Sequence, residues 1–332
     1  MFIVNSYSLA VLFLFITMLC WGSWANTQKL ATKQWPFQLF YWDYAIGVIL
    51  VSLILAFTAG SIGTNGRSFI QDLSQAEISS LGSAFLGGIV FNIANLLLVA
   101  AIAIAGMAVA FPIGIGLALA LGVIVNYIAS PLGNPMILFT GVIFVVIAIL
   151  LDAKAYRKLP LSKDSPTKGI VISLLAGVLM GFFYRFVAAS MVTDFVNPEA
   201  GKLTPYTASV IFSLGLLVSN FLWNSIFMYK PLTGEKVTYR DYLKRGDTRL
   251  HLIGILGGAI WSLGFTVNII AAEQAGFAIS YGLGQGATLV AAFWGVFIWK
   301  EFKGAKGVNG LLTAMFLFFI VGLGLIIAAR LY

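Results

Sequence analysis

The chain has 332 residues, 60% hydrophobic and 10% charged, with a formal net charge of +8. Apolar runs of about 20 residues, long enough to cross a ~30 Å hydrocarbon core, follow one another along it, so we expect an integral membrane protein. One cysteine, Cys20, and one histidine, His251, exclude an internal disulfide and a Cys/His metal site, and basic residues spread over short loops argue against nucleic-acid binding.

The apolar runs predict an all-α fold of ten transmembrane helices. In chain order these helices are expected at residues 8–27, 37–59, 81–104, 107–128, 136–152, 169–190, 205–228, 250–272, 276–299 and 308–330. No Lys or Arg precedes the first apolar run, so we expect that run to be retained as a span rather than cleaved as a signal peptide.

Residues 86–128 recur without a gap as residues 256–298, so the chain contains two copies of one unit. Gly87 and Gly88 match Gly257 and Gly258, for example. Equivalent helices are five spans apart, which predicts two inverted five-helix repeats, residues 1–158 and 159–332. Inverted repeats of this kind are typical of secondary transporters, in which the solute site lies between the repeats near the bilayer midplane.

Charge predicts the orientation of the spans. The loops that follow the odd-numbered helices carry most of the Lys and Arg residues: Lys29, Lys33, Lys154, Arg157, Lys158, Lys163, Lys168, Lys230, Lys236, Arg240, Lys244, Arg245, Arg249, Lys300, Lys303 and Lys306. The opposite side carries only Arg67, Lys202 and Arg330. The positive-inside rule therefore predicts cytosolic odd-to-even loops and both termini outside, in a plasma (inner) membrane.

Glycine and proline mark two weak points in the spans. Pro112, Gly114 and Gly116 in the fourth expected helix correspond to Gly282, Gly284 and Gly286 in the ninth. Proline removes a helical hydrogen bond, and glycine loosens the backbone, so we expect bent or partly unwound helices beside a central cavity.

Polar side chains inside the spans are the candidate solute ligands, because they are costly in lipid. Asn92 and Asn95 share one helix face, and two further polar positions, Tyr281 and Gln285, share another. Together with Ser262 and the rings of Phe91 and Trp261, they predict a hydrogen-bonding cavity with aromatic walls for a small neutral polar solute. The alternative is that these groups only bond neighbouring helices.

Charged residues inside the spans are rarer. Asp43 lies about two turns into the second expected helix, so it is the candidate for coupling transport to a proton. Its alternative role is a structural ion pair with Lys29 or Lys33. Arg185 and Glu273 are expected to pair near the outer face, as a gate or as a static ion pair.

Several segments of the first half resemble the ureide permease family, within the drug/metabolite transporter superfamily. They are Asp43-Tyr44-Ala45-Ile46, residues 56–63, Gly87-Gly88-Ile89-Val90, Asn95-Leu96 and residues 122–127. The third and fourth expected helices also resemble the related glucose/ribose and rhamnose transporter branch. Plant ureide permeases share a long central loop with a Walker-like motif, which residues 151–168 lack.

The resemblance implies proton-coupled import of allantoin, uracil or similar compounds, or of monosaccharides such as ribose or rhamnose. We therefore expect a secondary active transporter that needs no cofactor, with a proton or sodium as coupling ion. A metabolite exporter or facilitative channel is the alternative. A membrane enzyme is disfavoured because the ionisable groups in the spans are isolated from one another. The sequence leaves the oligomeric state open.

Overall fold

The computed structural model describes residues 1–31, 35–159 and 166–332, and these ranges contain helices but no strand. Nine helices in these ranges are long and apolar enough to cross a membrane. They are Tyr7–Ala31 (α1, Tyr7–Ser23, continued by α2, Ala25–Ala31), α3 (Phe37–Phe57), α5 (Ile78–Ala105), α8 (Pro135–Tyr156), α9 (Pro166–Ser190), α10 (Pro205–Tyr229), α12 (Thr248–Ala275), Phe277–Ile298 and α15 (Asn309–Ala328). The chain is therefore an integral membrane protein.

The fourth expected helix is interrupted. It consists of α6 (Met107–Ala110), a π-helical turn η1 (Phe111–Ile115) and α7 (Gly116–Ala129), of which Ile113–Ala129 forms a shorter apolar helix. π-Helical turns are rare and occur mostly as single-turn distortions of α-helices. The interruption falls at Pro112 and Gly114, where the sequence predicts a bent or partly unwound helix.

The corresponding segment of the second half is interrupted too. It is divided into α13 (Phe277–Gly284), α14 (Ala287–Phe293) and a second π-helical turn, η2 (Trp294–Ile298). Gly106 and Gly276, which precede the two segments, both have positive φ, at 78° and 82°. Glycine adopts this conformation without the strain that a side chain would add. The interruptions predicted from the glycines are thus present in both segments.

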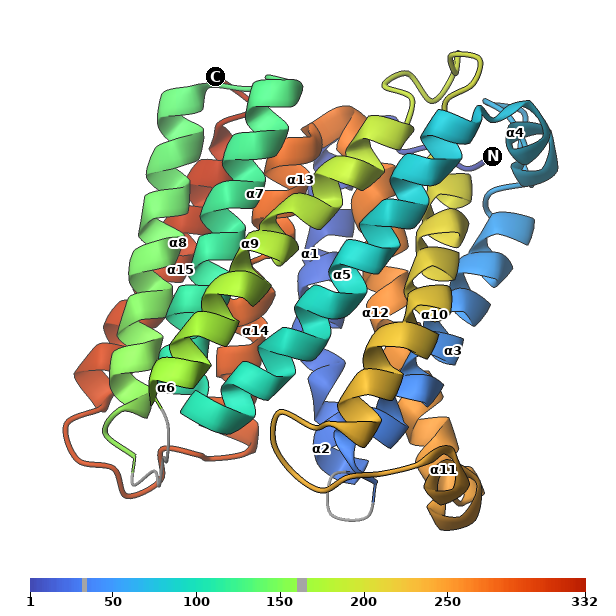
Figure 1. The fold of residues 1–332 in the computed structure, drawn as a ribbon. Coiled ribbons are helices and arrows are strands. Elements are labelled where there is room, and N and C mark those ends of the chain that lie inside the picture. Colours follow the sequence, from blue (N-terminus) through green and yellow to red (C-terminus); the bar gives the residue numbers. More distant parts are fainter. Residues whose placement is uncertain (32–34, 160–165) are drawn as a thin grey trace.

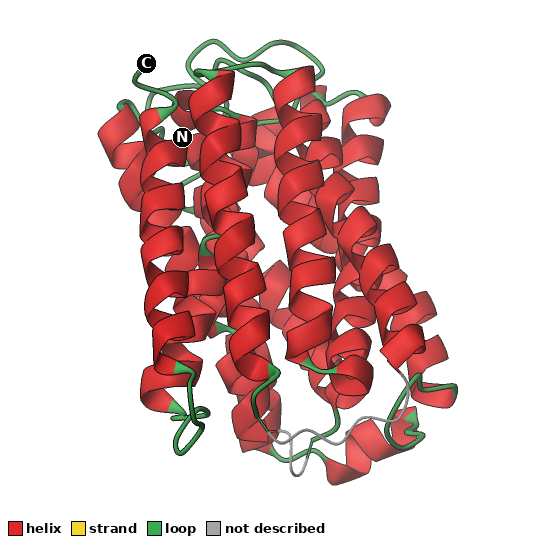
Figure 2. Ribbon diagram, turned by 90° about the vertical axis from the view of Figure 1, so that its left-hand side faces the viewer, coloured by secondary structure: helices red, strands yellow, loops and turns green. Residues whose placement is uncertain are grey.

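The helices run between two opposite ends of the molecule, and both termini lie at one end, with α4 (Phe69–Gln75) beside the N-terminus (Figures 1 and 2). The other end carries α2 and the short helix α11 (Tyr239–Arg245). Packing follows a repeated pattern: α12 packs against α1 and α3, while α5 packs against α9 and α10. Helices that are five spans apart in the expected order therefore make corresponding contacts.

Equivalent glycines allow two of these contacts. A side chain at Gly88 of α5 would collide with the backbone of Phe212 in α10, and one at Gly258 of α12 would collide with the backbone of Tyr44 in α3. Small residues at such positions let the backbones of membrane helices approach closely. The repeated Gly-Gly pair is thus explained by helix packing in both halves.

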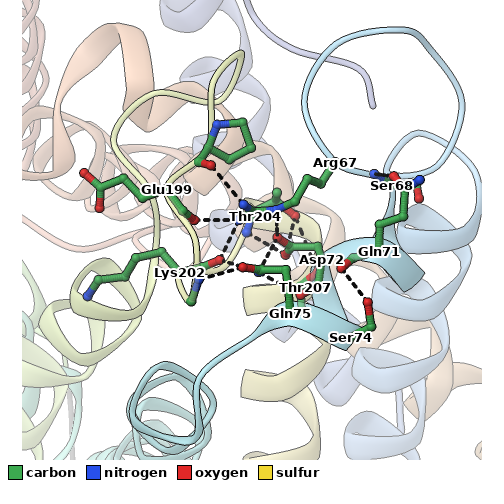
Figure 3. A network of polar contacts seen from close by, with 12 residues as sticks. Arg67, Ser68, Gln71, Asp72, Ser74, Gln75, Glu199, Lys202, Thr204 and Thr207 are labelled. Atoms are coloured by element: carbon green, nitrogen blue, oxygen red, sulfur yellow. Dashed lines mark hydrogen bonds and ion pairs between the residues drawn. The ribbon is translucent and has the colours of Figure 1, made fainter.

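An ion pair at α4 is hydrogen-bonded to the loop between α9 and α10 (Figure 3). Asp72 is fully buried; its carboxylate lies 2.8 Å from Arg67 Nε and accepts hydrogen bonds from the backbone N–H and hydroxyl of Thr204 at 2.7 and 2.9 Å. The Arg67 guanidinium also donates to the backbone carbonyls of Pro198, Glu199 and Lys202. One carboxylate therefore holds together two loops that are distant in the sequence.

Replacing Asp72 with Ala is expected to lower the free energy of unfolding by about 3 kcal/mol, because it leaves the half-buried Arg67 without its counter-charge. Thermal unfolding in detergent measures the effect. Glu199→Ala is the matched control, because Glu199 is exposed and contributes only its backbone carbonyl to the network. Equal melting temperatures for the two variants would contradict the structural importance of Asp72.

Candidate solute cavity

A cavity of about 560 Å³ lies among α1, α2, α5, α9, α12 and α14. It reaches from Trp261 and Phe91, inside the bundle, to Lys29 and Glu301 at the end that carries α2 and α11. Its aromatic lining includes Trp21, Trp24, Phe91, Phe183, Trp261, Trp294 and Trp299, and its polar lining includes Asn26, Gln28, Lys29, Asn95, Gln285, Thr288 and Glu301. The cavity therefore combines wide apolar surfaces with a few polar groups, as small-molecule sites do.

Stacked rings form the inner wall of the cavity. Trp261 stacks on Trp21, with ring centroids 5.8 Å apart and planes 9° from parallel, and its ring centroid lies 4.4 Å from that of Phe91. Phe265 and Phe212 stack behind Trp261 and are fully buried. Such a wall presents flat faces against which a planar solute can stack.

Two of the predicted amide side chains reach the cavity. Asn95 lines it and donates its N–H to the hydroxyl of Tyr41 at 3.2 Å. Gln285 lines it at the interruption between α13 and α14. An amide has two N–H donors and a carbonyl acceptor, so the bond to Tyr41 leaves Asn95 with capacity for a solute.

Three predicted ligands are not part of the cavity wall. Asn92 donates to the backbone carbonyl of Leu216 in α10 at 3.2 Å, and Ser262 donates to that of Val48 in α3 at 2.9 Å. The hydroxyl of Tyr281 donates to two backbone carbonyls, in α7 and α9. In this conformation these groups bond neighbouring helices, and solute contact by them stays a prediction.

Asp43 lies outside the cavity wall, in a polar network at the α11 end of the molecule. Its side chain is almost fully buried; Oδ1 lies 2.8 Å from His251 Nδ1 and accepts a hydrogen bond from Tyr242 at 2.6 Å, while Oδ2 accepts one from Trp35 at 3.1 Å. Burial, and then the nearby Asp43 carboxylate, raise the pKa of the Tyr242 hydroxyl, so it stays protonated and donates at physiological pH. The network joins α3, α11 and α12.

The structural ion pair expected for Asp43 is not formed with Lys29. Lys29 instead contacts Glu301 Oε1 at 2.6 Å, and its ammonium lies 4.3 Å from the ring centroid of Trp299. The other expected partner, Lys33, lies outside the described residues. The carboxylate of Asp43 is thus satisfied by hydrogen bonds from aromatic side chains and the histidine.

Sequence reasoning missed the polar cluster at the mouth of the cavity. Besides Lys29, Glu301 binds Tyr156, whose hydroxyl donates to Oε2 at 2.7 Å. Trp299 Nε1 donates to Asn26 at 2.6 Å. The available signal was Glu301 itself, an acidic residue that follows the ninth predicted helix, beside Lys300, Lys303 and Lys306.

The predicted pair of Arg185 and Glu273 is absent. Glu273 Oε1 accepts a hydrogen bond from the backbone N–H of Phe195 at 2.7 Å, and Arg185 forms no ion pair within the described part of the chain. Glu273 therefore supports the loop after α9 instead of neutralising the arginine. The gate expected from this pair is not formed in this conformation.

Comparison with known proteins gives the chain its family. The family model described as ureide permease matches residues 40–165 and 154–329. Ureide permease 1 of Arabidopsis thaliana is 24% identical over 99% of this chain and 99% of its own length. Ureide permease 5 of the same plant is 25% identical over 99% and 96%, and the probable ureide permease A3 of Vigna unguiculata is 24% identical over 91% and 97%.

A solved crystal structure covers 96% of this chain and 96% of its own at a TM-score of 0.59 and 13% identity, which is a likeness of fold alone. The family model, by contrast, spans nearly the whole sequence and both halves of the bundle around the cavity. Members of this family are transporters and not enzymes. The chain belongs to the ureide permease family.

Proposed function

We propose that the protein is a secondary active transporter for a small neutral polar solute, which binds in the cavity between two inverted five-helix halves, residues 1–158 and 159–332. The observation that carries the proposal is the cavity itself, with stacked tryptophans and amides inside the bundle and an opening toward one end. The repeated packing of equivalent helices and the two interrupted segments support ten spans and an origin in the drug/metabolite transporter superfamily.

The proposed solute is a ureide such as allantoin, or an oxo-heterocycle such as uracil. The names of the relatives support this class, and a flat ring bearing N–H and carbonyl groups matches stacked indoles beside Asn95 and Gln285. A monosaccharide is the second candidate, because the same amides would bind hydroxyl groups. The bias of basic residues supports a cytosolic location for the open end of the cavity, which leaves both termini outside.

A proton is the proposed coupling ion, and Asp43 its proposed carrier. The carboxylate is almost fully buried and lies 2.8 Å from His251 Nδ1, and ionisable side chains inside transmembrane helices are typical of proton pathways. Because the network joins α3, α11 and α12, a change of charge on Asp43 would alter how these three elements pack.

Uptake by purified protein in lipid vesicles tests the proposal. Labelled allantoin, uracil, ribose and rhamnose are offered separately under a proton gradient, a sodium gradient and no gradient. We expect accumulation of a ureide or oxo-heterocycle driven by the proton gradient. Uptake that only equilibrates under every gradient would support a facilitative channel, and uptake of none of the four solutes would contradict the proposed substrates.

Asn95→Ala is expected to raise the half-saturating solute concentration about fivefold, because a hydrogen bond to a neutral group contributes ~1 kcal/mol. Initial uptake rates measure the effect. Asn92→Ala is the matched comparison, in the same helix but with its amide bonded to α10. An unchanged value in Asn92→Ala fits helix packing, whereas a rise equal to that of Asn95→Ala would assign Asn92 to the solute site.

A further inference from the structure

The C-terminal end of α8 contains a buried carboxyl group that the proposed function does not use. Asp152 is 8% exposed, and its Oδ1 is buried without a hydrogen-bond partner. One turn further along α8, the Tyr156 hydroxyl donates to Glu301 Oε2 at 2.7 Å. Asp152 interacts electrostatically with both Tyr156 and Glu301. Asp152 therefore lies one helical turn from Tyr156, which binds Glu301 at the mouth of the cavity.

The close approach of these side chains depends on Gly295. A Cβ atom at this position would lie 3.0 Å from the Tyr156 hydroxyl and 3.1 Å from Glu301 Oε2, closer than most such contacts allow. Glu301 is further held by the 2.6 Å ion pair to Lys29, which itself lies over the ring of Trp299. The cluster is thus packed on several sides and not a chance gathering of surface charges.

No cation is available to balance Asp152 in the described part of the chain. The elements packed against α8, namely α15, α6, η1 and α7, contain no charged residue. Lys29 is already paired with Glu301, and Lys158 donates to the backbone carbonyl of Gly307. The remaining basic residues of this region are exposed to solvent: Lys154, Arg157, Lys300, Lys303 and Lys306.

A mostly buried carboxylate that has no cation, and one of whose oxygens has no hydrogen bond, is unfavourable, and a nearby carboxylate adds repulsion. The group avoids this cost by binding a proton. We propose that Asp152, one helical turn from the pair of Tyr156 and Glu301, is a proton-binding site behind the mouth of the cavity, and that loss of this proton weakens solute binding from that side. The effect on solute binding rests on the proposed transport function, whereas the proton site does not.

Glu301 connects the site to the cavity. When the O–H bond of Asp152 breaks and the proton leaves to solvent, the new carboxylate repels Glu301, which holds Lys29 and Tyr156 in the cavity wall. These three lining groups then shift. Solute affinity therefore depends on pH at the end of the molecule where Glu301 lies, separately from the proton proposed for Asp43.

Infrared spectroscopy of the purified protein tests the proton site without any solute. We expect a carboxylic-acid C=O band at ~pH 6 that disappears at higher pH and is absent from Asp152→Asn, whose amide resembles the protonated acid in shape. The band should persist in Glu235→Gln, which removes an exposed carboxylate at the same end. A band that is unchanged in Asp152→Asn would overturn the proposal. A wild-type band that disappears at fixed pH when sodium chloride is added, but persists when choline chloride is added, would also overturn it.

Allantoin binding, followed by tryptophan fluorescence, tests the effect on the cavity. In the wild-type protein we expect the affinity to fall about tenfold from ~pH 6 to ~pH 9, which corresponds to a coupling of one pKa unit. Asp152→Asn should stay at the low-pH affinity throughout, and Glu301→Gln should keep the infrared band but lose the pH dependence. A pH dependence that persists in both variants would overturn the inference, whereas a wild-type protein that binds none of the proposed solutes would contradict the proposed function instead.

Discussion

Asp43→Asn is expected to abolish solute accumulation driven by a proton gradient while leaving solute exchange intact. Asparagine cannot carry the proton. It has the size and shape of aspartate, and its amide oxygen in the place of Oδ1 can still accept the hydrogen bond from Tyr242, although the bond from Trp35 to Oδ2 is lost. With one proton per solute, a gradient of one pH unit supports at most ~10-fold accumulation in the wild-type protein. In the variant this ratio should fall to about one.

The measurement compares uptake under an imposed pH gradient with exchange of labelled for unlabelled solute in the same vesicles. Asp247→Asn is the matched control. Asp247 is the N-cap of α12, the helix that carries His251, and asparagine caps a helix as well as aspartate does. Wild-type accumulation by Asp43→Asn would remove Asp43 from the coupling mechanism and leave the buried network with a purely structural role.

The sequence could predict those parts of the site that depend on one helix at a time. Four of the predicted residues line the cavity: Phe91, Asn95, Trp261 and Gln285. An amide inside an apolar helix is costly in contact with lipid, so it is expected to face the protein interior or a cavity. The same argument could not separate Asn95 from Asn92. They lie on one face of α5, and only the position of α10 decides that Asn92 is covered.

Contacts between distant segments were beyond sequence reasoning. The ion pair of Lys29 with Glu301 joins residues 272 positions apart, and Asp43 contacts His251 across 208 positions. Each of these residues can be explained by its position in a loop or at a helix end, so the sequence offered no reason to expect a distant partner for it. The glycines, in contrast, predicted the interruptions of both segments because backbone freedom is a local property.

Gly88→Ala is expected to lower the free energy of unfolding by about 1–3 kcal/mol, because the added methyl group forces α5 away from the backbone of Phe212 in α10. Gly258→Ala should have a similar effect at the equivalent contact between α12 and α3. If the two halves have the same packing, the two losses should agree within a factor of about two, which is the usual variation between sites.

Thermal unfolding in detergent, at one fixed heating rate, measures both losses, since unfolding of such proteins is often irreversible. Gly82→Ala is the matched control in the same helix as Gly88, because no atom lies within 4 Å of a Cβ atom added there. Alanine forms helices better than glycine does, so this control should be neutral or slightly more stable. A loss at Gly88 without one at Gly258 would show that the repeated glycines pack differently, and it would remove the packing argument for two equivalent halves.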